Sequence, residues 1–162
     1  MNPAVLSSET SIMVTFLASF LIWIMFAGLI FMWVIDGRIK REQALHALLA
    51  TLLSWVITMM IKSLLPSARP YIDNGTIPLT LTTPNAYSSF PSAHAAIAFA
   101  MATSLWVHNK KLGSKFIILA MLVSFGRILS NVHYLSDVFA GIVIGIASAF
   151  VTKRLHTFKA VG

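Results

Sequence analysis

Residues 11–35 read SIMVTFLASFLIWIMFAGLIFMWVI, a run of 25 residues without a charged side chain. At about 1.5 Å per residue, a helix of this length rises about 38 Å, which exceeds the roughly 30 Å of hydrocarbon in a bilayer. The run is too long for the core of a signal peptide and has no basic leader. We therefore expect a retained transmembrane helix over residues 11–35, and a second one over residues 44–65.

The composition extends this interpretation to the rest of the chain. Of the 162 residues, 57% are hydrophobic and only 10% are charged, which is too little charge to cover a soluble domain. The chain contains no cysteine, so disulfides and thiolate chemistry are excluded. The formal net charge of +7 comes from basic residues in short connections between apolar runs, a pattern of membrane topology. We expect no nucleic-acid partner.

Three further apolar runs cover residues 92–107, 116–129 and 137–151. The sequence thus predicts one all-α domain over residues 1–162, a polytopic transmembrane bundle of about five spans in the lipid bilayer. Because the last three runs are short, we expect their outer ends to lie below the membrane surface and to leave a recess. Residues 66–91 hold five of the six prolines and are predicted to form an irregular loop.

The basic residues predict the orientation of the bundle, because short loops rich in Lys and Arg stay in the cytoplasm. The rule places the N-terminus outside and the C-terminus in the cytoplasm, at the cell membrane. Only three cations then remain toward the outer side, namely Lys62, Arg69 and Arg127. The nine that are predicted to face the cytoplasm are Arg38, Lys40, Arg41, Lys110, Lys111, Lys115, Lys153, Arg154 and Lys159.

The same outer segments carry Ser92, His94, His133 and Asp137. Each has an ordinary explanation when taken alone: Ser92 as a helix N-cap, and Asp137 as a partner of backbone donors at a helix start. His133 and Asp137 are four residues apart, so on one helical face the carboxylate would orient the imidazole as a base or nucleophile.

Together, these residues and the three cations form an anion site with acid and base groups. Lys62 alone could instead extend its ammonium group to the interface. Phosphate suits three cations best, because two guanidinium groups can each pair with its oxygens in bidentate fashion.

Three motifs give the sequence a family resemblance. They are Lys62-SLLPSA-Arg69-Pro70, Pro91-Ser92-Ala93-His94 and Gly126-Arg127-ILSNV-His133-YLS-Asp137. In this order they resemble the signatures of the type 2 phosphatidic acid phosphatase superfamily. Two positions depart from the usual pattern: Ala93 stands for Gly, and Gly126 stands for Ser. The family usually has six membrane helices, so the resemblance implies that the sixth would lie at the N-terminal side of the motifs.

The resemblance implies a mechanism. His133 would attack phosphorus and form a phosphohistidine, Asp137 would hold the imidazole, and His94 would protonate the leaving oxygen and then activate water. Lys62, Arg69, Arg127 and Ser92 would bind the phosphoryl oxygens. The resemblance implies no metal and no cofactor, and loss of the hydroxyl at Gly126 is expected to leave activity intact.

The resemblance also suggests substrates. Small bacterial members resemble undecaprenyl pyrophosphate phosphatases, so we expect that lipid as substrate, with the site facing the exterior. Phosphatidylglycerophosphate, phosphatidate, diacylglycerol pyrophosphate and lipid A phosphate are the alternatives. A non-enzymatic anion-conducting or anionic-lipid-binding protein is a further interpretation, but it does not require His133 and Asp137 at this spacing.

Overall fold

The computed structural model describes residues 8–35 and 38–159. Both chain ends and Asp36 of the predicted basic turn lie outside the described residues. Within these ranges the regular structure is helical, apart from one isolated parallel β-bridge between Ser67 and Ser88. The helices are α1 (Ser8–Ser19), α2 (Leu21–Ile35), α3 (Arg38–Leu64), α4 (Pro70–Asp73), α5 (Ala93–His108), α6 (Lys110–Leu129) and α7 (Leu135–Lys159).

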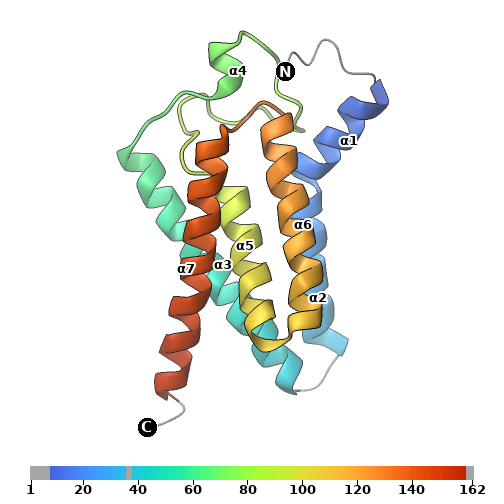
Figure 1. Cartoon of the computed structure of the whole chain (residues 1–162), viewed down its shortest axis with the longest axis vertical. Helices are drawn as coiled ribbons and strands as arrows, with labels where there is room; N and C mark the ends of the chain where they lie inside the picture. Colours follow the sequence, from blue (N-terminus) through green and yellow to red (C-terminus); the bar gives the residue numbers. More distant parts are fainter. Residues whose placement is uncertain (1–7, 36–37, 160–162) are drawn as a thin grey trace.

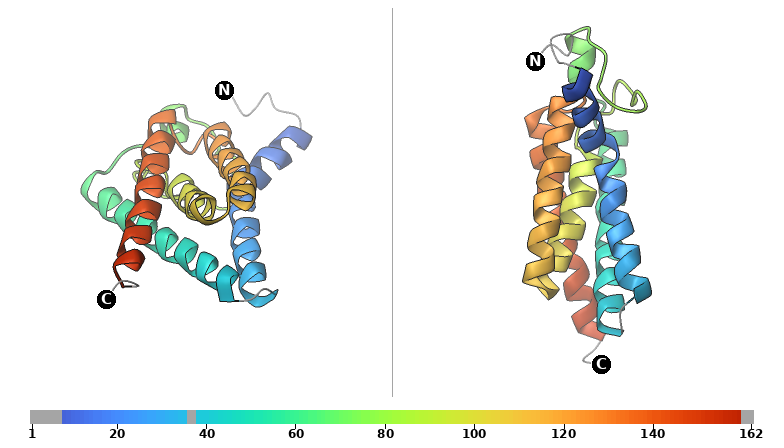
Figure 2. Two further views of the ribbon diagram at one scale, coloured as in Figure 1. Left: turned by 60° about the horizontal axis from the view of Figure 1, so that its bottom comes forward. Right: turned by 90° about the vertical axis from the view of Figure 1, so that its right-hand side faces the viewer.

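Helix α5 is the centre of the bundle. It packs against α3, α6 and α7, and α2 closes the remaining side between α3 and α6 (Figures 1 and 2). The residues of α5 that contact its neighbours are mostly small, with Ala95, Ala96, Ala98, Ala100 and Ala102 all buried. Small side chains let helix backbones approach closely, and this packing drives association where lipid removes the hydrophobic effect.

By length and composition, α3, α6 and α7 can each cross a membrane, and the pair α1–α2 can do so as one broken span. The transmembrane helix expected over residues 11–35 is broken, because the chain bends by 46° between α1 and α2. The structure thus gives three to four candidate spans. The span predicted over residues 92–107 corresponds to α5, which is apolar but has only 16 residues.

The expectation of three short outer helices is also wrong in part. Helix α6 has 20 residues and α7 has 25, because both continue through basic residues that the apolar runs leave out. Only α5 stays short, and in Figure 1 its upper end lies deeper in the bundle than the upper ends of α6 and α7. Of these three helices, only α5 therefore begins deeper in the bundle.

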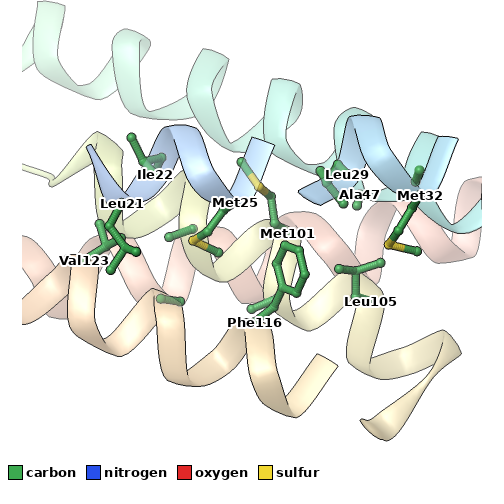
Figure 3. Close-up of a cluster of buried hydrophobic side chains, with 14 residues drawn as sticks. Leu21, Ile22, Met25, Leu29, Met32, Ala47, Met101, Leu105, Phe116 and Val123 are labelled. Atoms are coloured by element: carbon green, nitrogen blue, oxygen red, sulfur yellow. The ribbon is translucent and has the colours of Figure 1, made fainter. Parts of the chain in front are cut away.

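The apolar core lies where α2, α5 and α6 meet. Met25 and Leu29 of α2 lie beside Met101 of α5 and Phe116 of α6 (Figure 3). Met25, Leu29 and Met101 have no exposed surface, whereas most of the large exposed apolar side chains point away from the bundle. The core is therefore confined to the lower and middle part, away from the loop over residues 66–91.

The two ends of the bundle differ in chemistry. The C-terminal ends of α2 and α7, the start of α3 and the α5–α6 turn lie at one end, and the cations predicted to face the cytoplasm belong to these segments (Figure 1). The opposite end carries α4, the loop over residues 66–91 and the α6–α7 connector. All three sequence motifs lie toward this opposite end of the bundle, although they come from distant segments of the chain.

Candidate active site

A close contact between α5 and α7 brings the second and third motifs together. A Cβ added at Gly141 of α7 would lie 2.5 Å from the carbonyl oxygen of Ser92, so the two backbones touch where α5 begins. The amide of Ser92 donates to the carbonyl of Asp137 at 2.9 Å. Glycines at positions 141 and 145 form a small-xxx-small pair, which explains why these helices pack so tightly. The start of α5 is thereby fixed beside Asp137.

Arg69 links the long loop to the α6–α7 connector. Its guanidinium donates to the backbone carbonyls of Asn85 at 2.7 Å, Val132 at 2.8 Å and Ser88 at 2.9 Å. It also contacts Nε2 of His133 at 3.2 Å, and it is 4% exposed. The loop folds back on itself to make this possible, since the amide of Arg69 donates to Ala86. The predicted irregular loop is thus ordered by hydrogen bonds around one cation.

These contacts define the tautomer of His133. A guanidinium has donors only, so Nε2 must accept from Arg69 and carries the lone pair. In the neutral ring the proton is then on Nδ1, which faces Oδ2 of Asp137 at 3.4 Å. His133 lies before the first residue of α7, so the connector rather than a shared helical face brings it to Asp137. The reactive nitrogen therefore points toward the cations.

Asp137 is held by groups that the sequence did not indicate. Its Oδ2 accepts from the hydroxyl of Ser89 at 2.6 Å and from the backbone amide of Tyr134 at 2.9 Å. Both Asp137 and Ser89 are buried, at 3% and 0% exposure. The contact with the backbone amide is the helix-start role that Asp137 would have if it acted alone, but the carboxylate also serves His133. Ser89 and Tyr134 thus complete the support of the pair.

Lys62, in the last turn of α3, reaches the loop that precedes α5. Its ammonium group donates to the carbonyls of Ser88 and, at 3.1 Å, of Ser89. It is half-buried rather than extended to the surface. Lys62 and Arg69 therefore share the carbonyl of Ser88, which places the first motif's two cations side by side.

Arg127 enters the site from α6. One of its terminal nitrogens, Nη1, donates to the backbone carbonyl of Ala18 in α1 at 3.0 Å. The side chain is 5% exposed, and its Nε is buried without a hydrogen-bond partner among the described residues. A buried guanidinium donor without a partner is costly, so an anionic ligand is the expected occupant of this position.

Ser92 and His94 open α5 on the same side. Ser92 is at the N-cap position, but its side chain makes no capping bond, and its Oγ is buried without a partner in the described part of the chain. Ala93 begins the helix in an ordinary conformation, as expected. Arg127, His133, Arg69 and Lys62 all lie within electrostatic range of His94. Two unpartnered donors, Oγ of Ser92 and Nε of Arg127, therefore belong to the same cluster.

The environment keeps the nucleophile candidate neutral. Burial lowers the pKa of His133 to about 3, the hydrogen bond that His133 donates to Asp137 opposes this shift, and Arg127, Arg69 and Lys62 add to it. A cavity of about 310 Å³ borders His133 and is also lined by Pro70, Asn74 and Tyr134, but none of the three cations lines it. A neutral imidazole beside three cations can attack an electrophile such as phosphorus.

All seven residues predicted for the site thus lie at one end of the bundle. No group of three or more His, Cys, Asp or Glu side chains that could hold a metal occurs within residues 8–35 and 38–159. Sequence reasoning missed Ser89 and the backbone groups of Asn85, Val132, Tyr134 and Ala18. Among these groups, only Ser89 could have been noticed in the sequence, because its hydroxyl lies two residues before Pro91 of the second motif.

Comparison with known proteins gives consistent results. The sequence model of the PAP2 superfamily matches residues 43–160. Bacitracin transport permease protein BcrC of Bacillus licheniformis is 30% identical over 138 residues, which are 84% of this chain and 66% of that protein. Undecaprenyl-diphosphatase BcrC of Bacillus subtilis (strain 168) is 30% identical over 126 residues, 78% of this chain and 64% of that protein. The chain thus spans just under two thirds of the length of these curated relatives.

A solved structure resembles the fold as a whole. The crystal structure of Aquifex aeolicus LpxE superimposes with a TM-score of 0.77 at 27% identity, and the match covers 93% of this chain and 89% of that one. The helical arrangement of most of this chain is therefore shared with a known protein rather than being particular to this chain.

Proposed function

Since the chain belongs to the PAP2 superfamily, as its three motifs predicted, we propose that it is an integral membrane phosphatase acting on lipid phosphates. The observation that carries this proposal is the position of His133, with Nε2 at 3.2 Å from Arg69 and Nδ1 at 3.4 Å from Asp137. The arrangement resembles a catalytic triad in which an imidazole takes the place of the serine nucleophile.

The reaction proceeds in two steps. Nε2 of His133 attacks phosphorus, the bond from phosphorus to the leaving oxygen breaks, and His94 gives a proton to that oxygen. Asp137 stabilises the positive ring through Nδ1–H. His94 then takes a proton from water, the water oxygen attacks phosphorus, and the bond from phosphorus to Nε2 breaks to release phosphate.

The cations supply the electrostatic part of catalysis. Lys62, Arg69 and Arg127 neutralise charge on the phosphoryl oxygens, and Ser92 donates through its unpartnered hydroxyl. Such stabilisation of developing charge is usually the largest contribution to phosphoryl transfer. The three cations occupy the place that Mg²⁺ takes in other phosphatases, so the proposed reaction requires no metal.

The substrate that we propose is undecaprenyl diphosphate, converted to the monophosphate. The support is the 30% identity with the Bacillus subtilis protein that bears the name undecaprenyl-diphosphatase. We further propose five spans in the cell membrane, with the short helix α5 counted as one of them, the N-terminus outside and the C-terminus in the cytoplasm. The gathering of basic helix ends opposite the site supports this orientation, which turns the site to the exterior.

The test is release of phosphate by the purified protein in detergent. Undecaprenyl diphosphate, phosphatidylglycerophosphate, phosphatidate, diacylglycerol pyrophosphate and lipid A are compared side by side at equal surface concentration. The proposal expects the highest kcat/KM for the undecaprenyl lipid. Because detergent offers no sealed compartment, transport cannot produce this signal. Absence of phosphate release from every lipid would refute a phosphatase and favour the transport role in the name of the Bacillus licheniformis relative.

A further inference from the structure

Arg127 is the only one of the three cations that is held by a segment outside the family match. The superfamily model begins at residue 43, so α1 and α2 precede it. The carbonyl of Ala18 that accepts from Arg127 is in the last turn of α1. The last four carbonyls of a helix lack partners within that helix, and the helix end carries partial negative charge. The guanidinium of Arg127 donates a hydrogen bond to one of these carbonyls and places a positive charge at the negative end of the helix.

Gly126 makes this contact possible. A Cβ added there would lie 2.7 Å from the backbone nitrogen of Ala18 and 2.7 Å from the carbonyl carbon of Leu17. Both atoms belong to the backbone of α1, which cannot move aside as a flexible side chain does. The serine that usually occupies this position in the related motif would therefore push α1 away. The glycine at position 126, where the related motif usually has serine, therefore allows α6 to approach the backbone of α1 at Ala18.

The bend between α1 and α2 lies next to this contact. No proline or glycine lies at positions 18–21, yet the chain turns by 46° there. Kinks without proline arise where a side chain engages the helical carbonyls. Arg127 does this at Ala18, and Ser19 accepts from the amide of Leu81 in the loop at 3.3 Å. The C-terminal end of α1 is thus held by Arg127 of α6 and by Leu81 of the loop over residues 66–91.

We propose that α1 is a positioning element of the phosphate site, and that Gly126 is the residue that lets it hold Arg127 in place. With Nη1 anchored on Ala18, the guanidinium keeps Nε and its remaining donors for the phosphoryl oxygens. This inference deepens the proposed function and rests on it for the activity measurement. It predicts that restoring the family's usual serine lowers activity.

The test variants are Gly126→Ser and Gly126→Ala in the full chain. A misplacement of about 1 Å can reduce turnover about 100-fold, so we expect kcat/KM to fall between about 10- and 100-fold. The matched control is Gly28→Ser, which also adds a side chain between the N-terminal helices and α6. There the nearest atom is the ring edge of Phe116 at 3.1 Å, which can move, so activity should stay near wild type.

A double-mutant cycle separates positioning from a general effect on folding. In the Arg127→Ala background, Gly126→Ser should lower kcat/KM by less than about twofold, because the residue that it displaces is already absent. Equal losses in both backgrounds would overturn the inference, and so would full activity of Gly126→Ser. Arg127→Lys gives a test that does not depend on the glycine variants folding. The single ammonium group of lysine cannot bind the carbonyl of Ala18 and the phosphoryl oxygens at the same time, so full activity of this variant would also overturn the inference.

Protection by inorganic phosphate distinguishes this inference from the proposed function. Phosphate should raise the thermal midpoint of the wild-type protein and of Gly28→Ser, but much less that of Gly126→Ser. If the wild type releases phosphate from no lipid yet shows this pattern, the proposed function fails and the role of α1 stands. If all three proteins are protected equally, the role of α1 fails, whatever the lipid assay gives.

Discussion

Replacing Ser89 by alanine tests whether the nucleophile depends on a fixed carboxylate. The hydroxyl of Ser89 donates to Oδ2 of Asp137 at 2.6 Å, and this is the oxygen that faces Nδ1 of His133. Ser89 has no exposed surface, and its hydroxyl is directed to Asp137. Without this bond, Asp137 keeps the amide of Tyr134 at 2.9 Å and the longer contact to His133 at 3.4 Å.

The magnitude follows from the type of bond. A hydrogen bond to a charged acceptor contributes about 1.5–3 kcal/mol, and each 1.36 kcal/mol corresponds to about tenfold in rate. If the bond is needed to hold Asp137 while the ring of His133 becomes positive, kcat should fall about 10- to 150-fold. KM should change little, because the cations that bind phosphate keep their contacts.

The assay measures phosphate release from the best lipid substrate in detergent, with kcat and KM determined separately. Ser114→Ala is the matched control, since its hydroxyl is exposed, bonds to the carbonyl of Lys110 at 2.7 Å and lies at the opposite end of the bundle. Ser89→Thr should recover part of the loss, because it keeps the hydroxyl. Unchanged kcat in Ser89→Ala, or a change confined to KM, would refute the reasoning.

Three further predictions concern the reaction. His133→Ala should insert normally and show no turnover, measured as phosphate release per detergent-purified protein; retained turnover would assign the nucleophile elsewhere. Chelators such as EDTA should leave the rate unchanged, whereas a strict requirement for Mg²⁺ would contradict a site built on cations alone. Because the pKa of His133 is lowered to about 3, its ring should stay neutral between pH 7 and pH 5, as ¹⁵N chemical shifts of labelled histidine would detect. A group whose folded pKa is lowered contributes stability above its unfolded value of about 6.5, and this contribution should decline as the pH falls from there toward 3.

The fold class could be predicted because hydropathy and the motifs report on different properties. Long uncharged runs indicated helices in lipid, and three motifs indicated the family, which the superfamily match confirms. Helix length was predicted poorly where polar residues extend a helix. Residues 110–115 and 153–159 are helical although they are basic, since the helix continues beyond the hydrocarbon as long as water satisfies its polar side chains.

The support of the site could be predicted least. Arg69 is held by the carbonyls of Asn85, Ser88 and Val132, and any residue offers a carbonyl, so side-chain identity carries no signal for such a contact. The bend after α1 was missed as well, and it lies beside a hydrogen bond between Arg127 and the backbone carbonyl of Ala18, 109 positions away. Side-chain chemistry therefore predicted the groups that we propose to react, whereas the backbone groups that hold them are found only in the structure.

The use of carbonyls to hold the cations has a physical consequence for phosphate binding. A carboxylate would fix a guanidinium equally well, but it would cancel the positive charge and compete with the ligand. Lys62, Arg69 and Arg127 are instead oriented by neutral acceptors, and the formal charge of the cluster with Asp137 is 3 − 1 = +2. Burying such a charge without counter-ions is costly, and a phosphate dianion of charge −2 removes this cost on binding. The same site should therefore bind the dianion of a terminal phosphate more tightly than the monoanion of a phosphodiester.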